Sequence, residues 1–354
     1  MTAYIIRRLL QLPLTMLGVT LLIFAMLQLL TPVERSALYV PSIPHNEGAI
    51  DAIIAKYGLD DPFYIQYWRW LVGHKDVNTG EIKGGVLRGD LGFSRSGRQD
   101  VIDMIAQRLP ATVEMALWSV FPIIGIGIWL GVISAINHNK PIDQIIRVFT
   151  TIGWSFPTFV FGLLVLLLFY TKLGWFPPGR LSDPINAVVM SPSFRRYTQL
   201  NTVDGLLNGR MDVFWDALRH LVLPILTLSY VVWARILRVT RSSMLETLRQ
   251  DYLRTARAKG LSEKIVVYRH AFRNALLPVI TIGGSMVVGL LDGTVVTEVI
   301  FNYPGMGSAT ARAASSLDAT AVLAFVLFGG MVLTVANLIV DVLYAMVDPR
   351  IRLT

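Results

Sequence analysis

The stretch RVTRSSMLETLRQDYLRTARAKGLSEKIVVYRHAFRNALLP, from Arg238 to Pro278, is strongly basic and lies between two apolar runs. Although it is long for a connection between apolar segments, it does not resemble a soluble domain. A membrane protein that presents such a segment to the cytosol offers a docking element to a soluble partner. The identity of that partner therefore decides the function.

Gly260 divides this stretch into two predicted helices. The first runs from about Ser242 to Lys259, where less polar residues recur at three- and four-residue spacing and form one packing stripe. Glycine accepts the left-handed conformation that ends a helix, and Ser262 can cap the second helix, Glu263–Asn274. Small residues at the bend favour insertion into a partner's groove, whereas a solvated segment on anionic lipid is the alternative. The stripe consists of Met244, Leu245, Leu248, Tyr252, Thr255 and Ala256.

The composition places the chain in a lipid bilayer. Of its 354 residues, 53% are hydrophobic and 16% are charged, against about 25% charged in an ordinary soluble domain. The net charge of +8 could indicate nucleic-acid binding, but the cations flank apolar runs, as the positive-inside rule requires. The absence of cysteine excludes disulfides, thiolate metal sites and cysteine nucleophiles, and it leaves the redox compartment open.

Apolar runs of spanning length predict an all-α polytopic membrane protein with six transmembrane helices. The first run is longer than the apolar core of about 7–15 residues in a signal peptide, so we expect a retained anchor. The fourth run is the shortest, and residues 214–220 are expected to extend it. The predicted spans are Leu9–Leu30, Ala111–Ile136, Val148–Tyr170, Leu221–Ala234, Leu276–Val296 and Val322–Val347.

The cations of the short connections predict the orientation of the spans. With six crossings they all fall on one side, which should be the cytoplasm. Both termini and the basic segment 235–275 are then cytoplasmic, whereas the long loops 31–110 and 171–220 are extracytoplasmic. The deciding cations are Arg7, Arg8, Lys140, Arg147, Arg350 and Arg352.

The first long loop contains two predicted helices. One covers Ala49–Tyr57 and ends at Gly58, and the other opens with Asp61 as its N-cap and Pro62 in its first turn. The aromatic residues of the second helix suit either a structural helix at the membrane interface, which we favour slightly, or a lid or receptor-docking surface. They are Phe63, Tyr64, Tyr67, Trp68 and Trp70.

Within the predicted spans, Gly127 and Gly131 form a Gly-x-x-x-Gly pair that lets a neighbouring helix approach closely. Pro157 is expected to kink the third span. In the second long loop, about 182–212 lacks strong periodicity and is interpreted as an insertion.

A search for catalytic and metal-binding patterns returns none. No Gly-Lys dipeptide is present, which excludes a Gly-x4-Gly-Lys phosphate loop, and neither a His-Glu-x-x-His helix nor a Gly-x-Ser-x-Gly elbow occurs. Any ATPase that drives transport is therefore expected to be another chain. The histidines are scattered, without metal-ligand spacing: His45, His74, His138, His220 and His270.

Acidic residues within the predicted spans bear on an ion-coupled mechanism. Asp292 lies near the outer end of the fifth span and Asp341 near the inner end of the sixth. Ion-driven carriers tend to keep such groups at mid-depth, where they are costly and functional. Their peripheral positions count against an ion-coupled secondary transporter without excluding it, and no nucleophile–base pair favours a membrane enzyme.

The basic segment resembles the "EAA" loop of binding-protein-dependent ABC transporter permeases. Asp251-Tyr252-x-Arg254-Thr255-Ala256 is similar to the version in the dipeptide/oligopeptide/nickel branch, with Thr255 where the general pattern has glutamate. The resemblance implies that the loop couples to an ATPase. It implies coupling roles for Asp251, Tyr252, Arg254, Thr255, Ala256, Arg257, Ala258, Lys259, Gly260, Leu261 and Ser262, and loop-supporting roles for His270, Asn274 and Pro278.

Further motifs extend the resemblance along nearly the whole chain, with no match near 182–212. They are Tyr4-Ile5-x-Arg7-Arg8-Leu9, Gly89-Asp90-Leu91-Gly92-x-Ser94, Glu298-x-x-Phe301-x-Tyr303-Pro304-Gly305-Met306-Gly307 and Asp348-Pro349-Arg350. Several ordered motifs make a chance match improbable.

The resemblance implies a permease subunit with the type I importer fold, in the bacterial cytoplasmic (inner) membrane. Residues 1–100 would form an N-terminal transmembrane helix with its loop, and 101–354 a core of five transmembrane helices with the coupling loop 238–275. The implied partners are a second homologous permease, two cytosolic ABC ATPases that bind ATP and Mg, and an extracytoplasmic solute-binding protein. This chain would bind no cofactor and would not be an enzyme. Dipeptides or oligopeptides are the expected solutes; nickel or an oligosaccharide is the alternative.

Overall fold

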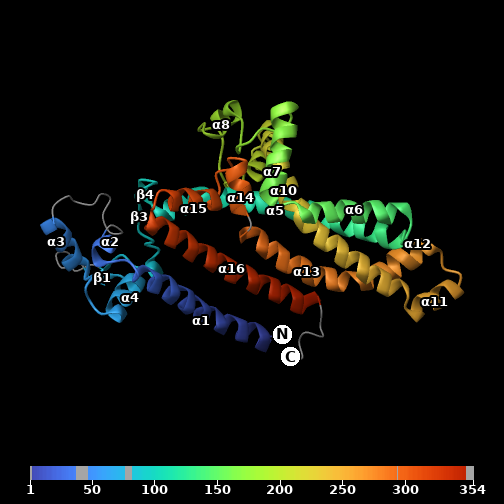
Figure 1. Ribbon diagram of the computed structural model, residues 1–354, viewed down its shortest axis with the longest axis horizontal. Coiled ribbons are helices and arrows are strands. Elements are labelled where there is room, and N and C mark those ends of the chain that lie inside the picture. The colour runs from blue at the N-terminus through green and yellow to red at the C-terminus, as the bar shows by residue number, and fades with distance from the viewer. Residues whose placement is uncertain (1, 37–46, 76–81, 293, 348–354) are drawn as a thin grey trace. The chain divides into compact units, whose positions relative to one another are not determined.

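The computed structural model describes residues 2–36, 47–75, 82–292 and 294–347, and these residues are predominantly helical (Figure 1). The chain divides into two compact units. Unit 1 is Met1–Leu109 with Met306–Leu338, and unit 2 is Pro110–Gly305 with Ile339–Thr354. The helical content confirms the prediction of a mainly helical membrane protein.

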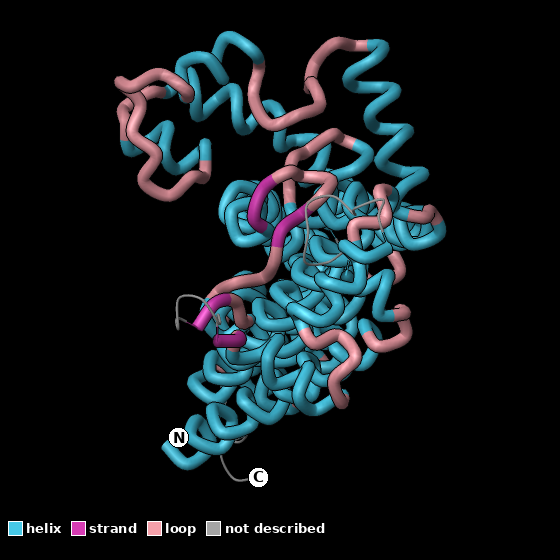
Figure 2. The backbone as a smooth tube through the Cα atoms, turned by 90° about the vertical axis from the view of Figure 1, so that its left-hand side faces the viewer, coloured by secondary structure: helices cyan, strands magenta, loops and turns pink. Residues whose placement is uncertain are grey.

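Unit 1 combines helices with two short antiparallel hairpins, which are the magenta segments of Figure 2. Its elements are α1 (Thr2–Leu27), α2 (Pro32–Ser36), α3 (Glu47–Tyr57), α4 (Phe63–Val72), β1 (His74–Lys75), β2 (Ile82–Lys83), a 3₁₀ turn (Val86–Arg88), β3 (Phe93–Ser94), β4 (Gln99–Asp100) and α15 (Met306–Ser315). Two long helices, α5 (Val101–Ile136) and α16 (Ala319–Val347), carry residues of both units.

All regular structure in the described residues of unit 2 is helical. Its elements are α6 (Pro141–Ser155), α7 (Thr158–Val165) with a π-helical extension (Leu166–Lys172), α8 (Asp183–Val189), α9 (Asn201–Leu207), α10 (Met211–Leu248), α11 (Asp251–Ala258), α12 (Glu263–Ile265) with a π-helical extension (Val266–Ala271), α13 (Phe272–Asp292) and α14 (Thr294–Ile300).

Several helices are apolar and long enough to cross a bilayer. Within the described residues, Val101–Ile136 and Ala319–Val340 qualify outright. Two bent helix pairs raise the number to four if each pair is one span, and Pro13–Leu27 is a shorter apolar helix. The six-span count and the cytoplasmic termini therefore remain predictions.

Two proline-related predictions have different outcomes. The third predicted span is interrupted, as expected, because α6 ends at Ser155 and Pro157 is the N-cap of α7. Pro224, by contrast, lies inside α10 without ending it. This helix also includes Phe214–His220, which confirms the expected extension of the fourth apolar run.

The glycine pair of α5 marks a close helix contact, as predicted. A Cβ built on Gly127 would lie 2.8 Å from the side chain of Ile236, and one on Gly131 would lie 2.6 Å from Thr240 Cβ. Real Cβ contacts are longer than this, so only glycine lets α10 approach α5 so closely.

The helices of the first long loop follow the prediction with one correction. Helix α3 ends at Tyr57, and Gly58 has the left-handed φ of 60°. Asp61 is not the N-cap of α4: that position is occupied by Pro62. The Asp61 carboxylate instead forms an ion pair with Arg69, one to two turns into the helix.

The aromatic residues of α4 divide between two faces. The ring of Phe24 in α1 lies 5.4 Å from the rings of Phe63, Tyr67 and Trp70, measured between centroids. Tyr64 and Trp68 point away and are exposed. The packed face has a structural role, whereas Tyr64, Trp68 and the exposed part of Phe63 are available to lipid or a partner.

The segment 182–212 is folded. Helices α8 and α9 each have only seven residues, which explains the absence of a long hydrophobic period. Val189, Phe194 and Val213 are buried together and form a small core under the segment.

Candidate functional site

The basic elbow between α10 and α13 is built differently from the prediction in its first half. The predicted helix over 242–259 is broken: α10 ends at Leu248, and α11 begins at Asp251 with Gln250 as its N-cap in an extended conformation. Asp251 then lies in the first turn of α11, where a negative charge favours helix initiation. The break creates a separate eight-residue helix at the tip of the elbow.

Gly260 ends α11 as predicted, with a φ of 76°. The Gly260 N–H donates to the Arg257 carbonyl at 2.9 Å, and the Leu261 N–H donates to the Ala256 carbonyl at 3.3 Å. This pair of bonds is the Schellman pattern, which requires a left-handed residue at the position of Gly260.

One face of α11 anchors it to the protein. Leu253 and Ala256 are buried in a cluster with Met244 of α10 and Val266 and Val267 beyond the bend. Because of the break after Leu248, Leu253 faces this core. Tyr252 and Thr255, which the predicted stripe included, are exposed. Leu253 was missed because an unbroken helix would place it outside the stripe.

The other face of the elbow is open. It presents cations, hydroxyls and small groups to the surroundings of the chain. Its exposed residues are Asp251, Tyr252, Arg254, Thr255, Arg257, Ala258, Lys259, Gly260, Leu261 and Ser262. We call this set the elbow face.

An ion pair closes the bend. Arg257 Nη2 lies 2.8 Å from Glu263 Oε1, and Arg257 Nε donates to Glu263 Oε2 at 3.0 Å. This bidentate contact holds the pKa of Glu263 below its ordinary value. The Ser262 side chain makes no capping hydrogen bond, so the predicted capping is incorrect although Ser262 is the N-cap residue of α12.

The three predicted support residues have different surroundings. Asn274 Nδ2 donates to the Tyr252 hydroxyl at 2.7 Å and lies 3.3 Å from the His270 carbonyl oxygen. Asn274 therefore joins α13 to the first turn of α11. His270 lies in the π-helical stretch, and Pro278 is exposed farther along α13.

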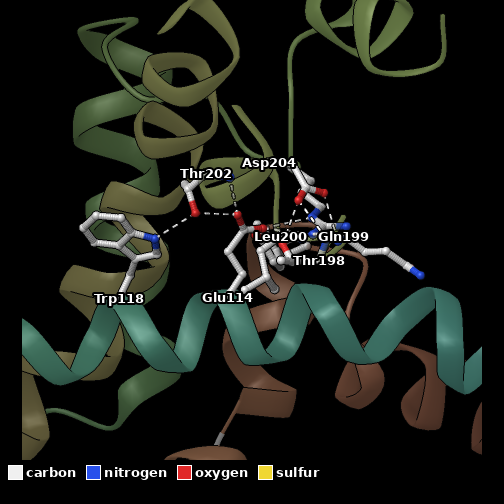
Figure 3. Close-up of polar contacts among 9 residues, drawn as sticks. Glu114, Trp118, Thr198, Gln199, Leu200, Thr202 and Asp204 are labelled. Carbon is white, nitrogen blue, oxygen red and sulfur yellow. Dashed lines mark hydrogen bonds and ion pairs between the residues drawn. The ribbon is translucent and has the colours of Figure 1, made fainter. Parts of the chain in front are cut away.

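A second polar group, centred on Glu114 of α5, was not predicted. Glu114 Oε1 accepts hydrogen bonds from the Thr202 N–H at 2.7 Å and the Thr202 hydroxyl at 2.8 Å. Arg180 Nη2 lies 2.9 Å from Oε2, and the Tyr303 hydroxyl lies 3.3 Å from it. Figure 3 shows Glu114 pointing from α5 toward Thr202, which also accepts a bond from the Trp118 indole.

This group fixes the segment 182–212 to α5. Burial, followed by the nearby Glu114 charge, raises the pKa of the Tyr303 hydroxyl well above its ordinary value, so the hydroxyl remains a donor. The signal in the sequence was a single acid near the start of an apolar run. Its partners lie 66 to 189 residues away, and no local pattern connects them.

The motif Gly89–Ser94 has a structural explanation. Ser94 is fully buried, and its hydroxyl donates to Asp318 Oδ2 at 2.7 Å. The same oxygen accepts bonds from the Ser96 N–H and hydroxyl. A Cβ on Gly92 would lie 2.7 Å from Thr320 Cγ2, so this glycine permits the β3–β4 hairpin to dock at the start of α16.

The motif Glu298–Gly307 is organised around a buried carboxylate. Thr112 Oγ1 donates to Glu298 Oε1 at 2.7 Å, and the Tyr303 N–H donates to the Glu298 carbonyl at 2.8 Å. A Cβ on Gly305 would overlap the Glu298 carboxylate. Glycine is therefore required for the loop to close over this acid.

Some sequence-predicted features lie outside the described part of the chain. These are residues 348–354, including the Asp348-Pro349-Arg350 motif, and the side chains of Arg7, Arg8, Asp292 and Asp341. Over the residues that are described, no three His, Asp or Glu side chains form a metal-binding group.

Comparison with known proteins gives consistent matches. Residues 127–353 match the family described as "Binding-protein-dependent transport system inner membrane component", and residues 1–116 match the corresponding N-terminal family. The chain is 37% identical to the oligopeptide transport system permease protein AppB of Bacillus subtilis, over 99% of this chain and 100% of the relative. It is 37% identical to the di/tripeptide transport system permease protein DppB of Pseudomonas aeruginosa and 35% identical to the dipeptide transport system permease protein DppB of Escherichia coli, each over 99% of both chains.

Proposed function

The chain belongs to the family of binding-protein-dependent transport system inner membrane components, and from this premise we propose how it works as the permease subunit of a peptide ABC importer. It is a multi-pass protein of the bacterial inner membrane and a transport component, not an enzyme. Its proposed solutes are dipeptides or oligopeptides. The relatives that it matches over nearly their full length are named for the transport of these substrates.

The proposed topology has six spans with cytoplasmic termini. Under it, the second and fourth spans cross in the same direction, and α5 and α10 pack in parallel: Gly127 meets Ile236, and Gly131 meets Thr240. The first and sixth spans would cross in opposite directions. Val19 of α1 lies near Gly330 of α16, and Ile23 shares a buried cluster with Leu327, as antiparallel helices would arrange them. Both helix pairings support this topology.

The proposed complete importer contains a second homologous permease, two cytosolic ABC ATPases and an extracytoplasmic solute-binding protein. ATP and Mg would be bound by the ATPases. This chain would contribute half of the translocation path and the contact through which the ATPases act on it.

The structure of the elbow is the main observation that supports this proposal. The elbow face would lie in a groove of one ATPase, where its cations could meet acidic residues. Because Leu253 and Ala256 anchor α11 in the protein, a push on the elbow would be transmitted to α10 and α13 instead of being absorbed by a mobile loop. Closure of the ATPase pair on ATP would thereby switch the path between its outward and inward states.

The test is purification of the tagged chain in mild detergent, followed by mass spectrometry of the proteins that accompany it. We expect a second permease and phosphate-loop ATPases in stoichiometric amounts. A chain that purifies alone and still takes up solute without ATP would overturn the proposal and favour an ion-coupled carrier.

A further inference from the structure

A buried carboxylate lies where the α5–α6 turn meets α10. Asp143 is fully buried and lies in the first turn of α6. Its carboxylate accepts hydrogen bonds from the Ser134 hydroxyl and, at 3.0 Å, from the Asn139 N–H. Arg241 of α10 supplies a bidentate contact: Nε donates to Oδ1 at 2.9 Å and Nη2 donates to Oδ2 at 2.8 Å.

Further groups surround the pair. Arg241 Nε also lies 3.0 Å from the Ser134 hydroxyl. The Nδ1 atom of His138 lies 3.1 Å from Arg241 Nη2 and 3.6 Å from Asp143 Oδ2. Arg147 Nε lies 3.8 Å from the same carboxylate oxygen. The network thus ties three consecutive pieces of chain, the end of α5, the turn and the start of α6, to one guanidinium.

The Asp143–Arg241 pair continues the close seam between α5 and α10. Gly131, three residues before Ser134 on α5, faces Thr240, the residue before Arg241, and one turn earlier on each helix Gly127 faces Ile236. The polar network therefore ends an apolar seam in which the two backbones already lie close together.

On its other side, the pair adjoins the anchor of the elbow. Met244, three residues after Arg241 and on the same face of α10, is buried with Leu253 and Ala256 of α11. Val132 and Ala135 of α5 belong to the same cluster. The elbow anchor, the end of α5 and the start of α6 consequently form one continuous packed body.

We propose that the Asp143–Arg241 pair is a positioning lock, which makes α5, α6 and α10 move together when the elbow is displaced. The inference rests on the proposed function, because it concerns how displacement of the elbow reaches the helices. Without the lock, displacement of α11 and α10 would no longer carry the start of α6 with it, and ATP hydrolysis would continue with little transport.

Stability alone is a weak reason for such a pair. A buried ion pair often stabilises a protein no better than an apolar replacement, because both charges must be desolvated. Its bidentate geometry, however, fixes orientation as well as distance. Lysine can keep the charge of Arg241 but cannot reproduce the two parallel bonds, so Arg241→Lys tests orientation separately from charge.

The structure offers a matched control on another part of unit 2. Arg210 and Asp212 form the same bidentate contact, with Nε to Oδ1 at 2.9 Å and Nη2 to Oδ2 at 2.7 Å. Both side chains are more than 40% exposed. Arg210→Lys therefore makes the same chemical change without disturbing the seam.

The experiment uses the complete importer in proteoliposomes with a radiolabelled dipeptide, and it measures uptake and ATP hydrolysis together. We expect Arg241→Lys to reduce dipeptide taken up per ATP about tenfold, as the loss of a charge-assisted bond allows, with hydrolysis nearly unchanged. Arg210→Lys should leave the ratio unchanged. Uptake and hydrolysis that fall in equal proportion, or equal effects of the two variants, would overturn the lock.

A milder variant tests the proposal if the importer with Arg241→Lys does not assemble. Ser134→Ala removes one hydrogen bond to Asp143 and leaves the ion pair in place, so the ratio should fall by a smaller factor; an unchanged ratio would count against the proposal. A wild-type importer that takes up no dipeptide with ATP would instead overturn the proposed function and, with it, this inference.

Discussion

Replacement of Gly260 by valine tests whether the shape of the elbow matters for coupling to the ATPase, apart from any effect on the stability of the chain. Gly260 has a φ of 76°, and a Cβ built there would meet no atom of the protein within 4 Å. The cost within this chain is therefore the left-handed backbone alone, about 1–2 kcal/mol for a residue with a Cβ. In the importer, the isopropyl group would also project from the elbow face into the proposed ATPase groove.

Gly209 provides the matched control. It follows α9, has a φ of 66°, and would likewise place a Cβ in open space. Its N–H donates to the Leu206 carbonyl and the next N–H to the Gly205 carbonyl, which is the bonding pattern found at Gly260. Gly209→Val should consequently carry the same backbone cost, but it lies outside the elbow.

The assay compares thermal unfolding of the purified chains with ATP-driven dipeptide uptake by the reconstituted importers. Both variants should unfold at similarly lowered temperatures, and only Gly260→Val should lose uptake or ATPase binding. Gly260→Ala, which has the strain but little bulk, should retain more uptake than the valine variant. Equal uptake by the Gly260→Val and Gly209→Val importers would refute the assignment of the elbow to an ATPase groove.

Three further predictions concern packing, topology and acidity. Gly305→Ala should destabilise the protein by about 1–3 kcal/mol in thermal unfolding, because its methyl group would overlap the Glu298 carboxylate. Single cysteines at Ala258 and at the exposed Leu87 should react with impermeant maleimide from opposite sides of the membrane; labelling from one side would contradict the six-span topology. Burial alone would raise the pKa of Asp318, but the hydrogen bonds from Ser96, Ser94 and the Ala321 N–H together hold that pKa below its ordinary value. The ionised Asp318 carboxylate therefore stabilises the folded protein fully above about pH 4, and this stabilisation is lost as the pH falls through the lowered pKa. The Asp318→Asn variant should unfold at a lower temperature than wild type at neutral pH. The difference between the two unfolding temperatures should become smaller in acid.

Local signals predicted the features that depend on local chemistry. Gly260 ends its helix because a left-handed residue is needed there. Pro157 stands at the N-cap of α7, where the backbone N–H that proline lacks is not needed for a helical hydrogen bond. The Gly127–Gly131 spacing predicted a close helix neighbour, although it could not say that the neighbour is α10. Motif order predicted the family, which the comparisons confirm.

Features that depend on distant partners could not be predicted in the same way. The break after Leu248 has no proline or glycine to mark it, and it follows from the burial of Leu253 against residues on both sides of the bend. The Glu114 group requires the segment 182–212 to fold back onto α5. The hydrophobic residues of that segment show no helical period, because each of its helices is only two turns long.

The buried charged side chains of unit 2 indicate which of its helices keep their contacts when the path switches. Helix α5 is fixed near one end through Glu114 and near the other through Ser134 and Asp143, with the glycine seam between them. Separation of either group would leave a charge buried without its partner, at a cost of about 3–5 kcal/mol. By contrast, α6 and α7 meet at Pro157 without a continuous helical hydrogen-bond ladder. We therefore expect switching of the path to leave the α5–α10 pair intact and to use breaks of this kind.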